Sequence, residues 1–189
     1  MARHGDDTGM ARTARLHARR WAAGTLAALA LAGCTPSGFP PACPQLSLIQ
    51  NASTLVQVAG KANQRDIRDL VLAARIEAVP ASCNFAAAHA VGAQLRVHFT
   101  VERGPAATSP DVQLHYFVAA TEGKTILDEK DFVVKGVFPP NADQMTLVGE
   151  PIHFRFPVSA DRSAAGYHIY VGFRLTETEL AYNRAQAAH

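Results

Sequence analysis

The sequence has no apolar run long enough for a permanent transmembrane helix. Spanning the hydrocarbon core takes roughly 20 apolar residues, whereas the apolar stretch at 21–32 has about a dozen. No acidic residue lies between Asp7 and Cys34. Five arginines precede the apolar stretch: Arg3, Arg12, Arg15, Arg19 and Arg20. A basic segment followed by a short apolar one is typical of a secretory leader, so we expect residues 1–33 to form a cleaved signal peptide. Because the basic segment is complete without residues 1–9, Met10 is an alternative start of translation.

Short catalytic motifs are also missing. The sequence has no phosphate-binding glycine loop, no GxSxG, no HExxH and no CxxC pair. We therefore expect a protein that is not an enzyme and needs no cofactor. A hydrolase of unrecognised class is the catalytic alternative, because a triad is defined by geometry rather than by spacing.

A basic excess is missing once the leader is set aside. The whole chain has 18 Lys and Arg against 16 Asp and Glu, a net charge of +2. Without the five arginines and two aspartates of residues 1–33, 13 basic residues face 14 acidic ones, a net charge of −1. Nucleic-acid binding depends on an electropositive surface, so we expect no nucleic-acid partner.

Cysteine is scarce, and the first of the three lies directly after the leader. The sequence LAGC at 31–34 looks like the lipobox of bacterial lipoproteins, in which the cysteine becomes the new N-terminus and carries the lipid. Cys34 is therefore the expected lipidation site, and an ordinary signal peptide with a chance cysteine is the alternative. Residues 34–42 are rich in Pro, Gly and small side chains, which predicts a short extended tether.

Lipidation of Cys34 leaves Cys43 and Cys83 as an even pair in an exported, oxidising setting. We expect these two cysteines to form a disulfide. Two free thiols, or a redox or metal pair, are the alternatives, although neither cysteine has a neighbouring histidine.

Apolar side chains alternate with polar ones along most of the remaining chain, which predicts strands rather than helices. Such runs begin near residues 70, 95, 112, 125, 132, 152 and 167, with turn-rich segments at 103–111, 139–144 and 159–166. We expect an all-β domain at 43–184, an antiparallel, immunoglobulin-like β-sandwich of about seven strands, with a small closed barrel as the alternative. Residues 185–189 would form a tail.

Several local details carry their own predictions. The segment 121–123 is typical of a hairpin turn, and Gly136 is a candidate β-bulge. The capping-box spacing of Thr176 and Glu179 predicts a short C-terminal helix. Residues 85–93 have the composition of a helical turn, with a loop as the alternative.

Histidines and arginines fall on the polar side of several predicted strands. If those strands share one sheet, the polar side chains form a ligand face that binds a divalent metal through imidazole or an anion through guanidinium. Ordinary solvated residues are the alternative, and we assign no metal ligand. The candidate residues are Arg96, His98, His115, His153, Arg155, His168 and Tyr170.

The lipobox is followed by CPQLSLIQNASTLV, VPASCNF, VERGP, YFVAAT, FPPNADQ and GFRLTETELAYNR. Together these segments resemble a group of uncharacterised lipoproteins of alphaproteobacteria. The resemblance implies an exported, lipid-anchored protein in which Cys43 and Cys83 are family features, but it implies no activity. Thr35 departs from the aspartate that retains enteric lipoproteins at the inner membrane, which favours the periplasmic face of the outer membrane.

We therefore expect a lipid-anchored envelope domain that binds another envelope protein or supports the envelope. A metal-binding or small-ligand-binding lipoprotein is the alternative. Since sandwiches carry function on loops and exposed sheet faces, the segments 103–111 and 139–144 and the ligand face are the surfaces of interest.

Overall fold

The computed structural model describes residues 42–60, 66–87 and 89–187, which lie in the compact unit Pro40–His189. Three 3₁₀ turns, η1 (Gln50–Ala52), η2 (Ile67–Asp69) and η3 (Ala164–Gly166), interrupt the strands. The strands and the helix are β1 (Gln45–Leu48), β2 (Thr54–Val58), β3 (Leu70–Ala78), β4 (Ala81–Ala87), β5 (Ala90–Leu95), β6 (His98–Arg103), β7 (Asp111–Glu122), β8 (Thr125–Val137), β9 (Gln144–Val148), β10 (Ile152–Pro157), β11 (Tyr167–Phe173) and α1 (Glu177–Ala187).

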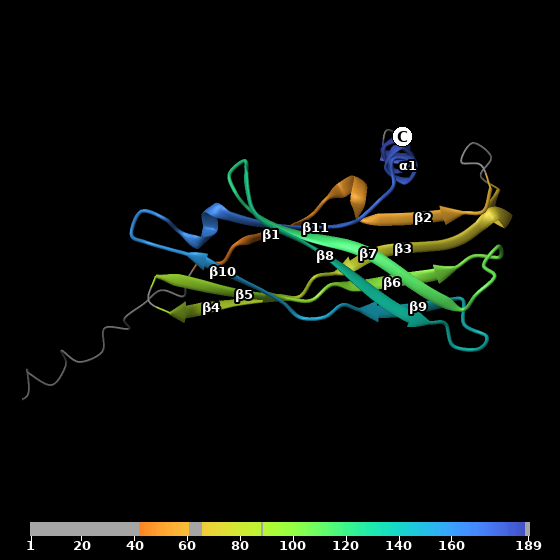
Figure 1. Ribbon diagram of the computed structural model, residues 1–189, viewed down its shortest axis with the longest axis horizontal. Coiled ribbons are helices and arrows are strands. Elements are labelled where there is room, and N and C mark those ends of the chain that lie inside the picture. The colour runs from red at the N-terminus through yellow and green to blue at the C-terminus, as the bar shows by residue number, and fades with distance from the viewer. Residues whose placement is uncertain (1–41, 61–65, 88, 188–189) are drawn as a thin grey trace, which may run out of the picture. The chain divides into compact units, whose positions relative to one another are not determined.

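These strands form a β-sandwich, as predicted (Figure 1). The first layer is a four-stranded sheet in the order β1-β11-β7-β8. The second layer consists of the sheets β2-β3-β6-β9 and β10-β5-β4. The strands β1 and β11 run parallel, and the pairs within the second layer are antiparallel.

A transverse crease divides the second layer into its two sheets. The strands β3 and β4 are interrupted at 79–80, β5 and β6 at 96–97, and β9 and β10 at 149–151. Backbone hydrogen bonds still join neighbouring segments within the crease, from Arg96 N to the Pro80 carbonyl oxygen and from Gly149 N to the Val97 carbonyl oxygen. Proline has no N–H to donate to a ladder, and Pro80 and Pro151 lie where the strands are interrupted.

The crease explains why the described part of the chain has eleven strands rather than about seven. Joined across the crease, the six short strands make three long ones, which brings the total to eight. The sequence pattern missed β1, β2, β4 and β9, of which β1 and β2 have only four and five residues, and the two runs predicted near 125 and 132 form the single strand β8. Alternation over so few positions is a weak signal.

The predicted alternation correctly identifies the core. Leu95, Val97, Phe99 and Val101 are all at most 1% exposed. The ring of Phe99 lies 5.0 Å from that of Tyr116 on β7 in the opposite layer. Burial of such side chains is the main contribution to stability in a sandwich.

Three local predictions have different outcomes. The β7–β8 hairpin forms as expected, but Thr121 and Glu122 still belong to β7 and the turn is at Gly123 and Lys124, where Gly123 has a φ of +57°. Gly136 is not a bulge, because it pairs regularly with Val112 and the register shift lies at 120–121. The 85–93 segment is neither helix nor a plain loop but belongs to the β4–β5 hairpin.

The helix α1 begins with the predicted capping box. The Thr176 N–H donates to the Glu179 carboxylate at 2.7 Å, and the Glu179 N–H donates to Thr176 Oγ1 at 3.3 Å. Asn183 is buried, and its amide nitrogen donates to the carbonyl oxygens of Asn51 and Thr54 at 2.9 and 2.8 Å. The helix continues to Ala187, past the predicted domain end at 184, and these bonds dock it onto the η1–β2 segment.

Tyr116 makes stability sensitive to alkali. Burial, helped by the negative charge of Glu150, raises the pKa of Tyr116 to about 12. Between pH 10 and 12 the unfolded chain loses this phenolic proton while the folded chain keeps it, so folding stability falls as pH rises. We expect the urea midpoint to decrease over this range, and Tyr116→Phe to make the decrease shallower. An equally steep decrease in that variant would contradict the assignment to Tyr116.

Candidate functional site

The residues of the predicted ligand face all lie outside the core. His98, His168 and Tyr170 are half-buried, and the other four, Arg96, His115, His153 and Arg155, are exposed. The structure nevertheless divides them between two layers. His115 is on β7, and His168 and Tyr170 are on β11, whereas the remaining four lie on or beside β5, β6 and β10.

This division means that the four histidines do not form one site. In each strand the neighbours of the histidine are buried against the opposite layer, so each histidine points away from the core. His115 and His168 therefore lie on the outer face of one layer, and His98 and His153 on the outer face of the other. The described residues contain no group of three or more His, Cys, Asp or Glu side chains that could hold a metal ion.

The outer face of the first layer instead carries one arginine, Arg174, held by two carboxylates and an aromatic ring. The Arg174 guanidinium donates to Glu129 at 2.6 Å and to Asp131 at 2.7 Å, and it lies 4.4 Å from the centre of the Phe117 ring. Hydrogen bonds to these two carboxylates raise the pKa of Arg174 further. With both carboxylates engaged, this arginine is a structural clamp between β8 and the start of α1 rather than an anion site.

The two turn-rich segments chosen from the sequence lie together. The Arg103 N–H donates to the Asp143 carbonyl oxygen at 2.7 Å, and the Phe138 N–H donates to the Pro110 carbonyl oxygen at 2.9 Å. We call residues 103–111 and 139–144 the loop end of the sandwich. They line or flank a hollow of about 350 Å³, whose lining residues include Arg103, Gly104, Pro105, Thr108, Ser109 and Asp143.

Arg103 is the only half-buried charged side chain among those lining residues. Its guanidinium lies 5.7 Å from the centre of the Phe138 ring and 3.5 Å from the Asp143 carboxylate. About a third of the side chain remains exposed. The sequence pattern marked this segment as a turn but gave no sign that Arg103 joins the two loops, because the contact partners lie far along the chain.

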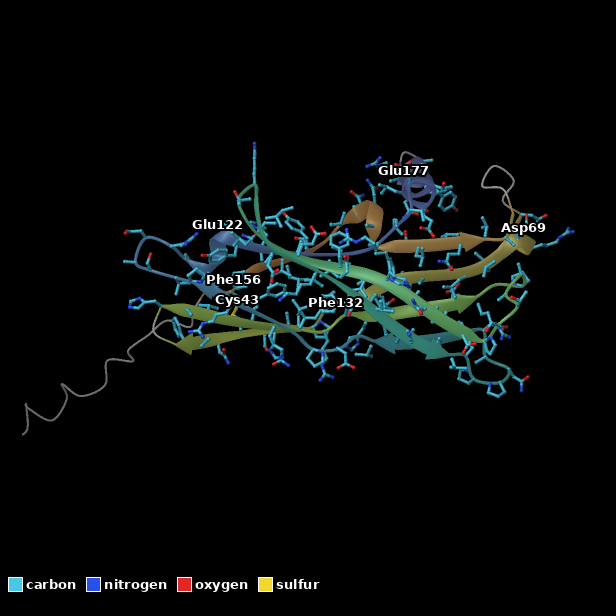
Figure 2. All side chains as sticks on the ribbon, in the orientation of Figure 1. Cys43, Asp69, Glu122, Phe132, Phe156 and Glu177 are labelled. Carbon is cyan, nitrogen blue, oxygen red and sulfur yellow. A yellow bond between two sulfur atoms is a disulfide. The ribbon has the colours of Figure 1, made fainter. Side chains whose placement is uncertain are left out.

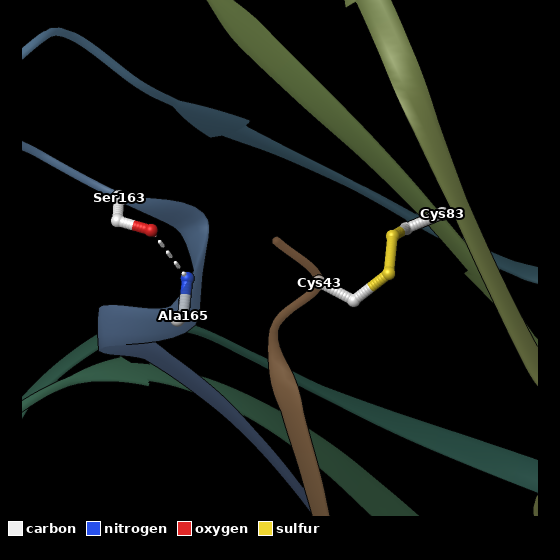
Figure 3. Close-up of a disulfide and its surroundings, with 4 residues drawn as sticks. All are labelled: Cys43, Cys83, Ser163 and Ala165. Atoms are coloured by element: carbon white, nitrogen blue, oxygen red, sulfur yellow. Dashed lines mark hydrogen bonds between the residues drawn. A yellow bond between two sulfur atoms is a disulfide. The ribbon is translucent and has the colours of Figure 1, made fainter. Parts of the chain in front are cut away.

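The predicted disulfide joins Cys43 to Cys83, with the two Cα atoms 5.9 Å apart (Figure 3). This bridge ties the residues that lead into β1 to β4 of the opposite layer. Figure 2 places Cys43 and Glu122 toward one end of the sandwich and Asp69 at the other. We call the end with the disulfide the tether end, and Arg103 at the end of β6 lies at the opposite end.

The expected lipidation site Cys34, the leader at 1–33 and nearly all of the tether at 34–42 lie outside the described residues. Within the described ranges, no helix has the length and apolar character needed to cross a membrane. Comparison with protein-family models, with curated proteins and with solved structures finds no match to this chain.

Proposed function

We propose that the chain is an exported lipoprotein, anchored through Cys34, that docks another envelope protein at its loop end without catalysing a reaction. The observation that carries the proposal is the Cys43–Cys83 disulfide at the end of the sandwich opposite the loops. An anchor just before Cys43 holds the tether end near the membrane. The loop end then faces away from the membrane, toward potential partners.

The length of the tether limits where the domain can lie. Eight residues separate Cys34 from Cys43, and an extended chain advances at most about 3.5 Å per residue. The tether end would therefore lie within about 30 Å of the anchor. The disulfide also suits an oxidising compartment outside the cytoplasm.

The form of the loop end favours a protein partner over a small molecule. Small-ligand sites enclose most of the ligand in a mainly apolar cavity. At the loop end Pro105, Thr108, Ser109 and Asp143 are exposed around a shallow hollow. Exposed loops on a rigid sandwich are a common binding surface for other proteins.

The anchor is tested by blocking its processing. Globomycin treatment, or Cys34→Ser, should leave a precursor of higher mass, and Cys34→Ser should also remove labelling by a radioactive fatty acid. The Ser37→Ala variant, altered within the same tether, should be processed and labelled as the natural chain is. Unchanged processing of Cys34→Ser would refute lipidation at this position.

Docking is tested by photo-crosslinking in intact cells. A photoreactive residue at Thr108 or Asn141, both exposed at the loop end, should give an adduct of defined mass. The same group at exposed Lys124, in the hairpin at the other end, should give that adduct at least several-fold less. Arg103→Glu should weaken the adduct. Equal adducts from both ends, or none from the loop end, would contradict docking there.

A further inference from the structure

The strand β8 is the longest in the described part of the chain and lies at the edge of its sheet. It has 13 residues and pairs with β7 on one side, while no described strand pairs with its other side. Four of the eight exposed large apolar side chains among the described residues belong to it: Ile126, Leu127, Val133 and Val137. A long edge with unpaired N–H and C=O groups and exposed apolar side chains is a template for pairing with another strand.

The two faces of β8 have different surroundings. Phe132 and Val134 pack toward the core, and the Phe132 ring stacks on that of Tyr116. By alternation, Asp131, Val133 and Lys135 point to the outer face of the sheet. On that face Asp131 also contacts Arg174, yet its side chain remains 69% exposed.

We propose that β8 pairs antiparallel with β8 of a second copy of this chain, with Val133 on the two-fold axis. A two-fold axis perpendicular to the sheet keeps each face continuous, so core-facing residues meet core-facing residues and outer residues meet outer residues. Two four-stranded sheets then become one eight-stranded sheet. The dimer is independent of the lipid anchor and of docking at the loop end.

The charges of β8 exclude several other registers. An axis through Glu129 or Asp131 places two carboxylates directly opposite each other, and an axis through Lys130 does the same with two ammonium groups. Like charges in directly opposite positions destabilise a strand pair. An axis through Phe132 avoids like pairs but sets Asp131 against apolar Val133.

The register centred on Val133 is complementary over residues 131–135, the positions nearest the axis. The half-exposed Val133 side chains of the two copies meet on the outer face. Asp131 of each copy lies opposite Lys135 of the other, which creates two ion pairs. Phe132 lies opposite Val134 twice, so that apolar side chains also meet on the core-facing side of the strand pair. Self-complementarity of this kind is what an isologous contact requires, and it favours a second copy over an unrelated strand.

The first test is a disulfide cross-link of the full chain in cells. Val133→Cys should produce a band of doubled mass on a non-reducing gel, because directly opposite residues of antiparallel strands lie about 5 Å apart between Cα atoms. The matched control is Val148→Cys on β9, which is 46% exposed against 48% for Val133. The natural chain sets the background from Cys34, Cys43 and Cys83. No doubled band, or an equal band from Val148→Cys, would overturn the proposal.

The second test exchanges the charges that define the register, with sedimentation of the full chain in mild detergent as the readout. Lys135→Asp alone and Asp131→Lys alone each create two like pairs in the dimer, and each should weaken dimerisation about tenfold. An equal mixture of the two variants restores both opposite pairs and should recover the dimer. The thermal unfolding midpoint of each variant shows whether it is still folded. If both variants are folded and their mixture stays monomeric, the proposed register is wrong.

Discussion

Replacing both Cys43 and Cys83 by serine is expected to lower the free energy of unfolding by about 4 kcal/mol. The bridge closes a loop between residues 40 positions apart, and its removal returns that loop's conformational freedom to the unfolded chain. Domains of this size are typically stable by 5–15 kcal/mol. The variant should therefore be close to its unfolding transition at 37 °C.

The measurement is urea denaturation of the full chain in mild detergent. The natural chain treated with a reductant should show a similar loss, because the same bridge is opened. Ser82→Ala, which alters an exposed neighbour of Cys83 on β4, should unfold at the urea concentration of the natural chain. A double serine variant that unfolds at that same concentration would mean that the disulfide adds no stability.

The core could be predicted from the sequence because alternation along a strand is a local property. Val97 and Phe99 point inward and His98 points outward whatever strand lies beside them. The capping box of α1 is equally local, since both partners lie within one turn. The cysteine pairing followed from a count of three with one assigned to lipid, and the structure confirms the pair.

The layer to which each strand belongs could not be predicted in the same way. Alternation says that His98 and His115 both point away from the core, but it does not say from which layer. Strand pairing joins segments far apart in sequence, as between β1 and β11. The ligand face required one shared sheet, and the structure places its histidines on opposite outer faces.

The 85–93 segment shows a different limit. Its alanines have high helix propensity, but the segment contributes to β4 and β5, and its own Val91 and Ala93 are buried in the core. Tertiary burial outweighs a preference of a few tenths of a kcal/mol per residue. Local composition could not reveal this, because the residues that cover the segment come from β10 and the opposite layer.

Gly104→Ala is the substitution expected to disturb the loop end most strongly. A methyl group on Gly104 would overlap the backbone carbonyl of Leu70, which cannot move without shifting β3. Two backbone hydrogen bonds hold the loop against β3, from Gly104 N to the Val71 oxygen and from Ala106 N to the Leu70 oxygen, each 2.9 Å. Overpacking together with loss of these bonds should lower the free energy of unfolding by about 3 kcal/mol.

Gly166→Ala is the matched control for this prediction. A methyl group at Gly166 meets no atom within 4 Å, so its stability in urea should remain close to that of the natural chain. Displacement of residues 103–111 from β3 in Gly104→Ala should also weaken the Thr108 photo-crosslink, while Gly166→Ala leaves it unchanged. A Gly104→Ala variant as stable as the natural chain would contradict the close contact between Gly104 and the Leu70 carbonyl. If it lost stability but kept the crosslink, the partner would not depend on the position of this loop.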